Sequence, residues 1–361
     1  MIVTTIIVIV KSMETKHHGK FHNTLTAVAI AGMIMTLMSI TACGAAVSTS
    51  ALQQSKSSAD VPASNTSDSS ENNKEQKKDE EPEESGEPVK GQRDNTSRVL
   101  VPSADGDMAY SDSSFSIDKS GASAGYVVID YEGSNDKPKL QVTGPESVTY
   151  TFDVHRGPET IPLTQGSGSY QICAFENIGG TKYAQLCAVS VDADITNEYS
   201  PYLYPNQYVD FTADSNVVAL GEELAFPCNN DLEVVSNVYN YMIDNVVYDT
   251  DLATSVQSGY LPDPDNTIAT GKGICFDYAA CMASMLRSQQ IPTRLEIGYA
   301  GDAYHAWIST YIDEVGWVNG IVEFDGTNWE LMDPTLAASQ GDKFLKSFIG
   351  DGNNYVKVYQ Y

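Results

Sequence analysis

The segment from Gly44 to Ser97 most constrains the fold, because it is almost free of aromatic and large aliphatic residues after Leu52. Such a segment cannot bury enough apolar surface to offset the entropy lost on ordering. We therefore predict a disordered, low-complexity tether over residues 44–110. It is either an arm that carries the folded part away from a membrane or a linker whose length alone matters. The packed core has to come from the residues that follow.

The residues before the tether have the order of a secretory signal. A polar, weakly basic stretch at residues 11–23 precedes an apolar run at residues 24–43. The run ends in "ITAC", Ile40 to Cys43, which resembles the lipobox of bacterial lipoproteins, where the cysteine is lipidated and becomes the first mature residue. We expect a lipoprotein signal peptide at residues 1–43, lipidation at Cys43 and anchoring at the outer face of the bacterial membrane. The alternative is an uncleaved membrane anchor.

The charge balance excludes one class of partner. With 21 Lys and Arg against 48 Asp and Glu, the formal net charge is −27. A chain this acidic would repel a polyphosphate backbone, so we expect no nucleic-acid partner. An apolar run at residues 1–10 fits neither part of the signal, which indicates Met13 as the start of translation.

Residues 111–194 consist of short alternating runs separated by Gly, Pro, Asn and Ser turns at near-regular spacing. This pattern predicts a small antiparallel β-sandwich, a spacer or binding module without catalytic residues. Cys173 and Cys187 flank the turn "NIGGT" symmetrically about Gly180. A hairpin would place them opposite one another, so we predict a cross-strand disulfide, the alternative being two small buried hydrophobic residues.

Residues 195–361 have mixed patterning. An Asn230 to Glu233 capping signature begins one helix, and "TGKGICFDYAACMASMLRSQQ" is a second. Strands are predicted at residues 293–300, 304–312, 321–326 and 328–333, the last two joined by an Asp325-Gly326 hairpin turn. Helices followed by an antiparallel sheet make this region an α+β domain.

Cys275 begins the second helix and is the candidate nucleophile. Gly271 and Gly273 let the backbone approach closely, while the helix N-terminus presents free N–H groups and positive dipole, which favour the reactive thiolate. Cys281 lies further along the helix, lacks those donors and is predicted to pack in the core.

A catalytic cysteine needs a base, and His305 is the histidine left in this region; the others are His17, His18, His22 and His155. The alternating stretch "YHAWISTYI" places His305, Trp307, Ser309 and Tyr311 on one face of a strand. Asp333 ends a later strand, from which its carboxylate could accept a hydrogen bond from the imidazole and fix its tautomer.

The motifs "GKGICFDYA", "YHAW" and "LMDPT", in that order, resemble the core motifs of bacterial transglutaminase-like proteins, relatives of papain-type cysteine proteases. The resemblance covers about Tyr199 to Ser339 and implies a papain-like α+β core. It implies that Cys275 is the nucleophile, His305 the base and Asp333 its orienter. Asp277, Tyr278 and Trp307 are neighbours within the motifs. The stretch at residues 315–328 is longer than in many members, which leaves the substrate open.

The implied reaction is acyl transfer from a protein or peptide amide through a Cys275 thioester, resolved by water or by an amine. Aromatic side chains could line a shielded acceptor channel: Tyr278, Trp307, Trp317 and Trp329. We expect no cofactor and no metal, because the acidic clusters and cysteines lack calcium or zinc spacing. Two alternatives are an inactive scaffold at the cell surface and a papain-type cell-wall amidase.

Overall fold

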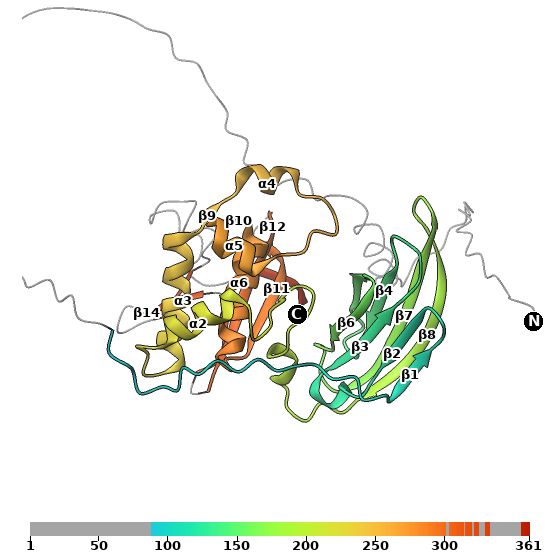
Figure 1. The fold of residues 1–361 in the computed structure, drawn as a ribbon, viewed down its shortest axis with the longest axis horizontal. Helices are drawn as coiled ribbons and strands as arrows, with labels where there is room; N and C mark the ends of the chain where they lie inside the picture. The colour runs from blue at the N-terminus through green and yellow to red at the C-terminus, as the bar shows by residue number, and fades with distance from the viewer. Residues whose placement is uncertain (1–87, 301–302, 314, 320, 325–328, 333–354) are drawn as a thin grey trace, which may run out of the picture.

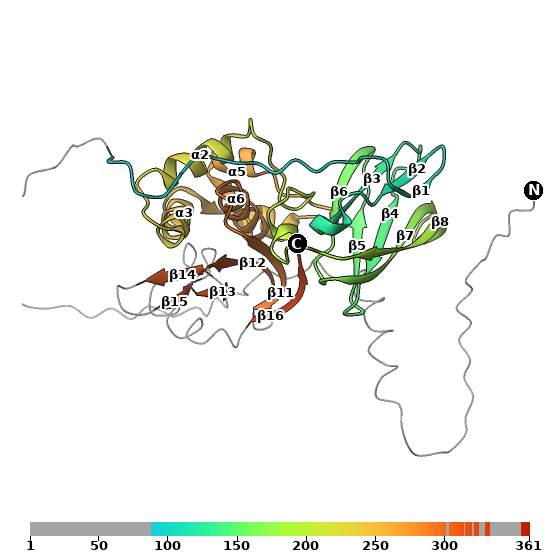
Figure 2. The ribbon, with the colours of Figure 1, turned by 90° about the horizontal axis from the view of Figure 1, so that it is seen from below.

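A computed structural model describes residues 88–300, 303–313, 315–319, 321–324, 329–332 and 355–361. An all-β region at residues 108–193 lies beside a region of helices and strands at residues 200–361 (Figure 1). Figure 2 shows the same two regions after a quarter turn. The predicted signal peptide, Cys43 and the tether up to residue 87 lie outside the described residues. Within those residues, no helix has the length and apolar character needed to cross a membrane.

The all-β region is built from two four-stranded antiparallel sheets, as the sequence predicts. One has the order β1-β2-β3-β6 and the other β5-β4-β7-β8. The strands of the first sheet are β1 (Met108–Ser111), β2 (Phe115–Asp118), β3 (Tyr126–Tyr131) and β6 (Gly157–Pro162). Those of the second are β4 (Lys139–Thr143), β5 (Thr149–Asp153), β7 (Gly168–Gly179) and β8 (Lys182–Ala193). Alternate side chains such as Ile129, Leu140 and Ile172 are fully buried in one hydrophobic cluster, which makes the region a sandwich.

The predicted disulfide between Cys173 and Cys187 is wrong. Both cysteines are free, and the β7–β8 register pairs Cys173 with Ala188 and Cys187 with Ala174. The register shifts between Ala174 and Phe175, so the symmetry of the two cysteines about Gly180 is lost. Because successive residues point to opposite faces of a sheet, Cys187 faces the core and Cys173 faces outward.

The second region begins with helices and confirms the predicted α+β class. The helices are α2 (Asn216–Ala225), α3 (Asp231–Asn245), α4 (Thr250–Ser255), α5 (Pro264–Thr270) and α6 (Cys275–Ser288). The Asn230 side chain accepts a hydrogen bond from the Glu233 N–H at 3.0 Å, so the predicted cap of α3 is confirmed. The sequence pattern did not indicate α2, α4 or α5.

The central sheet has the antiparallel order β13-β12-β11-β16. Its strands are β11 (Thr293–Ala300), β12 (Ala303–Ile312), β13 (Gly316–Asn319) and β16 (Tyr355–Gln360). Two small pairs complete the region: β9 (Val247–Tyr248) with β10 (Lys272–Gly273), and β14 (Ile321–Phe324) with β15 (Trp329–Met332). Helix α6 packs between α2, α3 and α5 on one side and β11 and β12 on the other. Every residue from Asp277 to Ser288 is consequently buried.

The end of the predicted tether is ordered, contrary to the prediction. Residues 91–98 form a strap along the helices, in which the Gly91 N–H donates to Phe226 O at 2.9 Å and the Arg98 N–H to Ser288 O at 2.7 Å. The Arg93 guanidinium pairs with Asp231 at 2.5 Å and donates to the Gln289 side chain at 3.0 Å. Composition predicted disorder because the strap has little apolar surface, whereas main-chain and charged hydrogen bonds fix it.

Candidate active site

Cys275 is the first residue of α6 and is partly exposed. The chain reaches it through Gly271, which ends α5 in a left-handed conformation (φ 61°) that glycine adopts at little cost. Gly273 follows, and a Cβ on it would lie 2.6 Å from the Asp277 Cβ, so only glycine fits there. The predicted close approach of the backbone at Gly273 is thus confirmed.

The start of α6 retains backbone donors. Ile274 occupies the N-cap position and has no side-chain oxygen to satisfy the N–H groups of the first turn. These N–H groups and the helix dipole favour an anion at Cys275. The arrangement suits both a thiolate and the oxyanion that forms when a thiolate attacks a carbonyl.

Three other cysteines of the described chain are buried and pack in the core. Cys281 is completely buried, and burial raises the pKa of its thiol well above the usual range. Cys228 and Cys187 are also buried, and burial raises the pKa of each to about 11. The prediction that Cys281 packs in the core is confirmed.

Asp277 lies two residues after Cys275 and is only 1% exposed. Its Oδ2 accepts the Ile274 N–H at 2.8 Å, and its Oδ1 accepts the Tyr260 hydroxyl at 2.7 Å. Burial raises the pKa of this carboxyl group, although the two hydrogen bonds act in the opposite direction. A buried carboxylate therefore ties the residue before Cys275 to a tyrosine that precedes α5.

His305 lies near the start of β12, the strand that packs on α6. It is 6% exposed and pairs across the sheet with Gly298. Its ring lies 6.3 Å from that of Trp307, centroid to centroid. The Trp307 Nε1–H and the Ser309 hydroxyl both donate to Glu296, at 2.7 and 2.6 Å, so the predicted shared face of these strand residues is confirmed.

Tyr304 is a residue of β12 that lies near the candidate nucleophile. Burial raises its pKa to about 12, and the neighbouring Tyr359, Tyr299 and Cys275 add to the increase. Tyr304 is nevertheless 46% exposed and packs edge-on against Tyr299 at 5.5 Å. Tyr304 was not among the predicted site residues, and strand alternation places it on the face opposite to His305.

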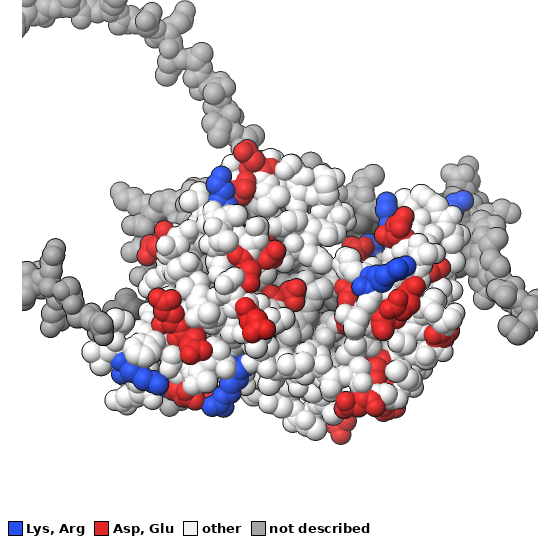
Figure 3. Space-filling view, viewed as in Figure 1, with Lys and Arg blue, Asp and Glu red and all other residues white. Residues whose placement is uncertain are grey.

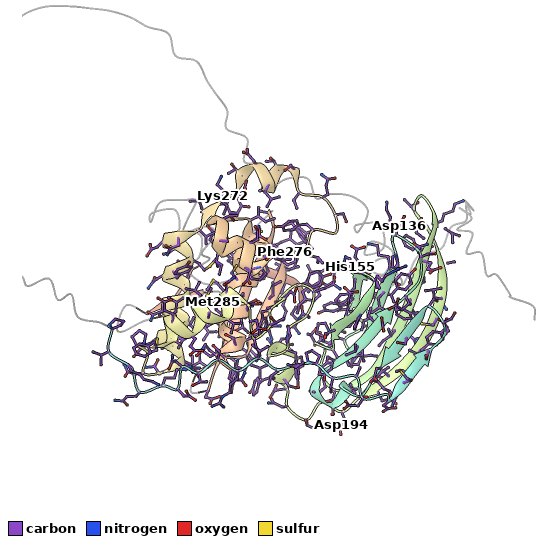
Figure 4. The ribbon with its side chains drawn as sticks, in the orientation of Figure 1. Asp136, His155, Asp194, Lys272, Phe276 and Met285 are labelled. Atoms are coloured by element: carbon purple, nitrogen blue, oxygen red, sulfur yellow. The ribbon has the colours of Figure 1, made fainter. Side chains whose placement is uncertain are left out.

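An aromatic bridge joins the start of α6 to the sandwich. The Tyr208 ring packs against two other rings: its centroid lies 5.7 Å from that of Phe276 and 5.9 Å from that of Phe152 in β5. Burial raises the pKa of Tyr208, and Asp153 adds to the increase. Figure 4 shows Phe276 and His155 on the two sides of this junction. The sandwich therefore packs close to the end of α6 that carries Cys275.

Two of the predicted cleft-lining residues have other roles. Tyr278 is fully buried and its hydroxyl donates to Val246 O, which makes it a core residue. The guanidinium carbon of Arg294 lies 3.5 Å from the centre of the Trp317 ring. In the sheet register, Trp317 is the partner of Tyr311 in β12. Tyr311 is six residues along the strand from His305, roughly 20 Å away, so Trp317 does not line a cleft at His305.

Trp307 adjoins His305, but its indole is 5% exposed. The Trp329 side chain and Asp333 lie outside what the structure describes, so their roles stay predictions. The complete Cys275, His305 and Asp333 triad is likewise still a prediction.

The acidic side chains near α5 have structural partners. Figure 3 shows many acidic and few basic side chains on the face of the molecule that is viewed in Figure 1. Asp263 caps α5 by accepting the Asn266 N–H at 2.9 Å, and Asp265 accepts the Val217 N–H at 2.8 Å. Among the described residues, no group of three or more His, Cys, Asp or Glu side chains could hold a metal ion.

Comparison with known proteins gives one curated relative with a short match. Over 96 residues the chain is 27% identical to the UPF0252 protein MJ1282 of Methanocaldococcus jannaschii, a match that covers 23% of this chain. The match covers 27% of that protein, so this chain spans about a quarter of the relative's length.

Two solved structures are similar at a remote level. A candidate cysteine protease from Cytophaga hutchinsonii is 19% identical over 63% of this chain and 77% of that chain, with a TM-score of 0.33. The periplasmic domain of TgpA from Pseudomonas aeruginosa is 16% identical over 70% of this chain and 76% of that chain, with a TM-score of 0.28. Scores this low carry no argument about activity.

The family comparison concerns the part of the chain that holds Cys275 and His305. Residues 218–320 match the model of the transglutaminase-like superfamily. The match begins within α2 and ends after β13. This part of the chain is therefore similar to the transglutaminase-like superfamily.

Proposed function

We propose that this protein is a membrane-tethered, extracytoplasmic cysteine enzyme that cleaves protein or peptide amides through a thioester at Cys275. The observation that carries the proposal is the placement of a partly exposed cysteine at the first residue of a buried helix whose first turn has no side-chain cap. The transglutaminase-like match over residues 218–320 agrees with this chemistry.

In the proposed reaction, the Cys275 thiolate attacks the carbonyl carbon of the amide. The N–H groups of the first turn of α6 stabilise the oxyanion. His305 then gives its proton to the leaving amine as the C–N bond breaks, and Asp333 holds the imidazole in the correct tautomer. Water or a second amine attacks the thioester, loses a proton to His305 and releases the thiolate.

We propose hydrolysis as the main outcome and amine transfer as the alternative. Transfer requires an amine to outcompete water, which calls for a shielded apolar channel. Trp317 packs on Arg294, and the Trp307 indole is buried, so neither residue is available to form such a channel. This distribution supports hydrolysis.

The experiment incubates the full-length protein with a pool of glutamine-containing peptides and a labelled primary amine. Both label incorporation and new N-termini are measured, with Cys275→Ala as the control. New N-termini without incorporation identify a peptidase, and incorporation without new N-termini identifies a transferase. If neither product forms, the proposal is contradicted, and a surface scaffold remains as the explanation.

The proposed location rests on the signal-like N-terminus and Cys43. We expect the mature chain to begin at a lipid-modified Cys43 and to partition into detergent. Mass spectrometry of the N-terminal peptide tests this, with Cys43→Ala as the control. An unmodified Cys43, or a retained preceding segment, would contradict a lipid anchor.

A further inference from the structure

Asp277 and Tyr260 form a buried hydrogen-bonded pair behind the candidate nucleophile. Asp277 is 1% exposed, and Gly273 makes room for its side chain. Its two oxygens have different partners: Oδ2 accepts the Ile274 N–H at 2.8 Å, and Oδ1 accepts the Tyr260 hydroxyl at 2.7 Å. Neither residue makes or breaks a bond in the proposed reaction.

We infer that Asp277, held by Tyr260, is a positioning residue that fixes the first turn of α6 around Cys275. The bond to Ile274 links the residue before Cys275 to the residue two positions after it. It therefore sets the direction in which the free N–H groups of the turn point. A displacement of about 1 Å in a reacting group can cost about 10²-fold in rate, so this restraint bears directly on the chemistry.

The two separate donors require a carboxyl group at this position. Burying the carboxyl group is unfavourable, as the raised pKa of Asp277 records. A neutral amide would avoid that cost, but its single oxygen cannot serve both donors on separate atoms. Burial and the bond to Asp277 also raise the pKa of Tyr260, which keeps its hydroxyl protonated as a donor.

The charged surroundings of the pair oppose an electrostatic role for Asp277. Asp249 and Asp263 both add to the increase in the pKa of Asp277. On the side of the sheet, Tyr304 is one titratable neighbour of Cys275, and His305 is the proposed base. One more negative charge near Cys275 would by itself disfavour a thiolate. Any benefit of Asp277 to the thiolate therefore has to come from the order it imposes on the turn.

This inference rests on the proposed function, but its test does not need a substrate. Full-length protein is treated with iodoacetamide across a pH series, and alkylation of the Cys275 peptide is followed by mass spectrometry. Asp277→Asn should move the midpoint of the alkylation profile up by about one pH unit, which slows the reaction about tenfold below the midpoint. Tyr260→Phe should shift it in the same direction by less.

The double variant should shift the midpoint no further than Asp277→Asn alone, because Tyr260 acts through Asp277. Asn230→Ala, which removes the cap of α3, is the matched control: it should lower the melting temperature without moving the midpoint. An unchanged or lower midpoint in Asp277→Asn, or additive shifts in the double variant, would overturn the inference. If the variants shift the alkylation midpoint as expected but the protein shows no amide turnover, only the proposed function is contradicted.

Discussion

The two ends of α6 differ in how they are built. At the first turn, Cys275 and Phe276 are partly exposed, and Ile274 provides no cap. At the last turn, Arg287 is completely buried and its guanidinium donates to three main-chain oxygen atoms. These belong to Thr293 at 2.9 Å, Tyr204 at 2.7 Å and Tyr361 at 2.7 Å.

The difference indicates a division of roles along one helix. The last turn satisfies its polar groups and fixes α6 to β11, to the end of β16 and to the segment before α2. The first turn leaves donors free, which costs stability but provides a site for an anion. A helix held firmly at one end can therefore carry a reactive residue at the other.

The largest expected effect concerns the two cysteines of α6. Cys275→Ala should lower amide turnover by about 10⁴-fold or more, because no other group in the mechanism replaces the nucleophile. Cys281→Ala should keep turnover and lose about 1–2 kcal/mol of unfolding free energy, because it leaves a small cavity in the core. The peptide assay measures amide turnover, and urea unfolding measures the free energy of unfolding. Amide turnover by Cys275→Ala would contradict the assignment of Cys275 as the nucleophile.

Arg287→Met tests the anchored end. The substitution keeps the volume but leaves three main-chain oxygen atoms without their donor, and we expect a loss of about 3–5 kcal/mol in unfolding free energy. Arg294→Met is the control, because Arg294 stacks on Tyr202 and Trp317 and should lose only about 1 kcal/mol. Equal losses in urea unfolding would mean that the last turn of α6 is not a special anchor.

The strap adds a second hold on the same end of α6. Arg93→Ala removes the pair with Asp231 and the hydrogen bonds to Gln289, and we expect a loss of about 1–2 kcal/mol. Hydrogen exchange should increase in the last turn of α6 and not at Cys275. Exchange that increases equally along the helix would show that the two ends are not separate.

Local patterns predicted the elements that carry the candidate site. The cap at Asn230, the start of α6 at Cys275 and the alternation of β12 depend on residues within a few positions of one another. The triad motif likewise identified Cys275 and His305, which fall within the transglutaminase-like match.

Features that depend on distant partners escaped prediction. The strap requires Arg93 to meet Gln289, 196 positions away, and Asp277 meets Tyr260 across 17 positions. The disulfide was predicted from symmetry in the sequence, whereas one shift in register separates Cys173 from Cys187. Composition and spacing carry no record of such pairings, because they arise only when the elements pack.

The smallest expected effect is a difference in pH dependence between the two ends. Burial raises the pKa of Asp277 above its ordinary value of 3.8, so the folded chain holds this proton to a higher pH than the unfolded chain does. Its contribution to the unfolding free energy is therefore complete below about pH 4 and is lost as the pH rises through the folded pKa. The slope is at most about 1.4 kcal/mol per pH unit.

Asp277→Asn lacks this titration. The stability advantage of the native chain over the variant should therefore shrink as the pH rises from about 4 towards neutrality, as measured by urea unfolding at each pH. The loss in Arg287→Met should stay constant over the same range, because a guanidinium does not titrate there. A constant gap for Asp277→Asn would mean that burial does not raise the pKa of the Asp277 carboxyl group. The first turn would then resemble the last in its response to pH.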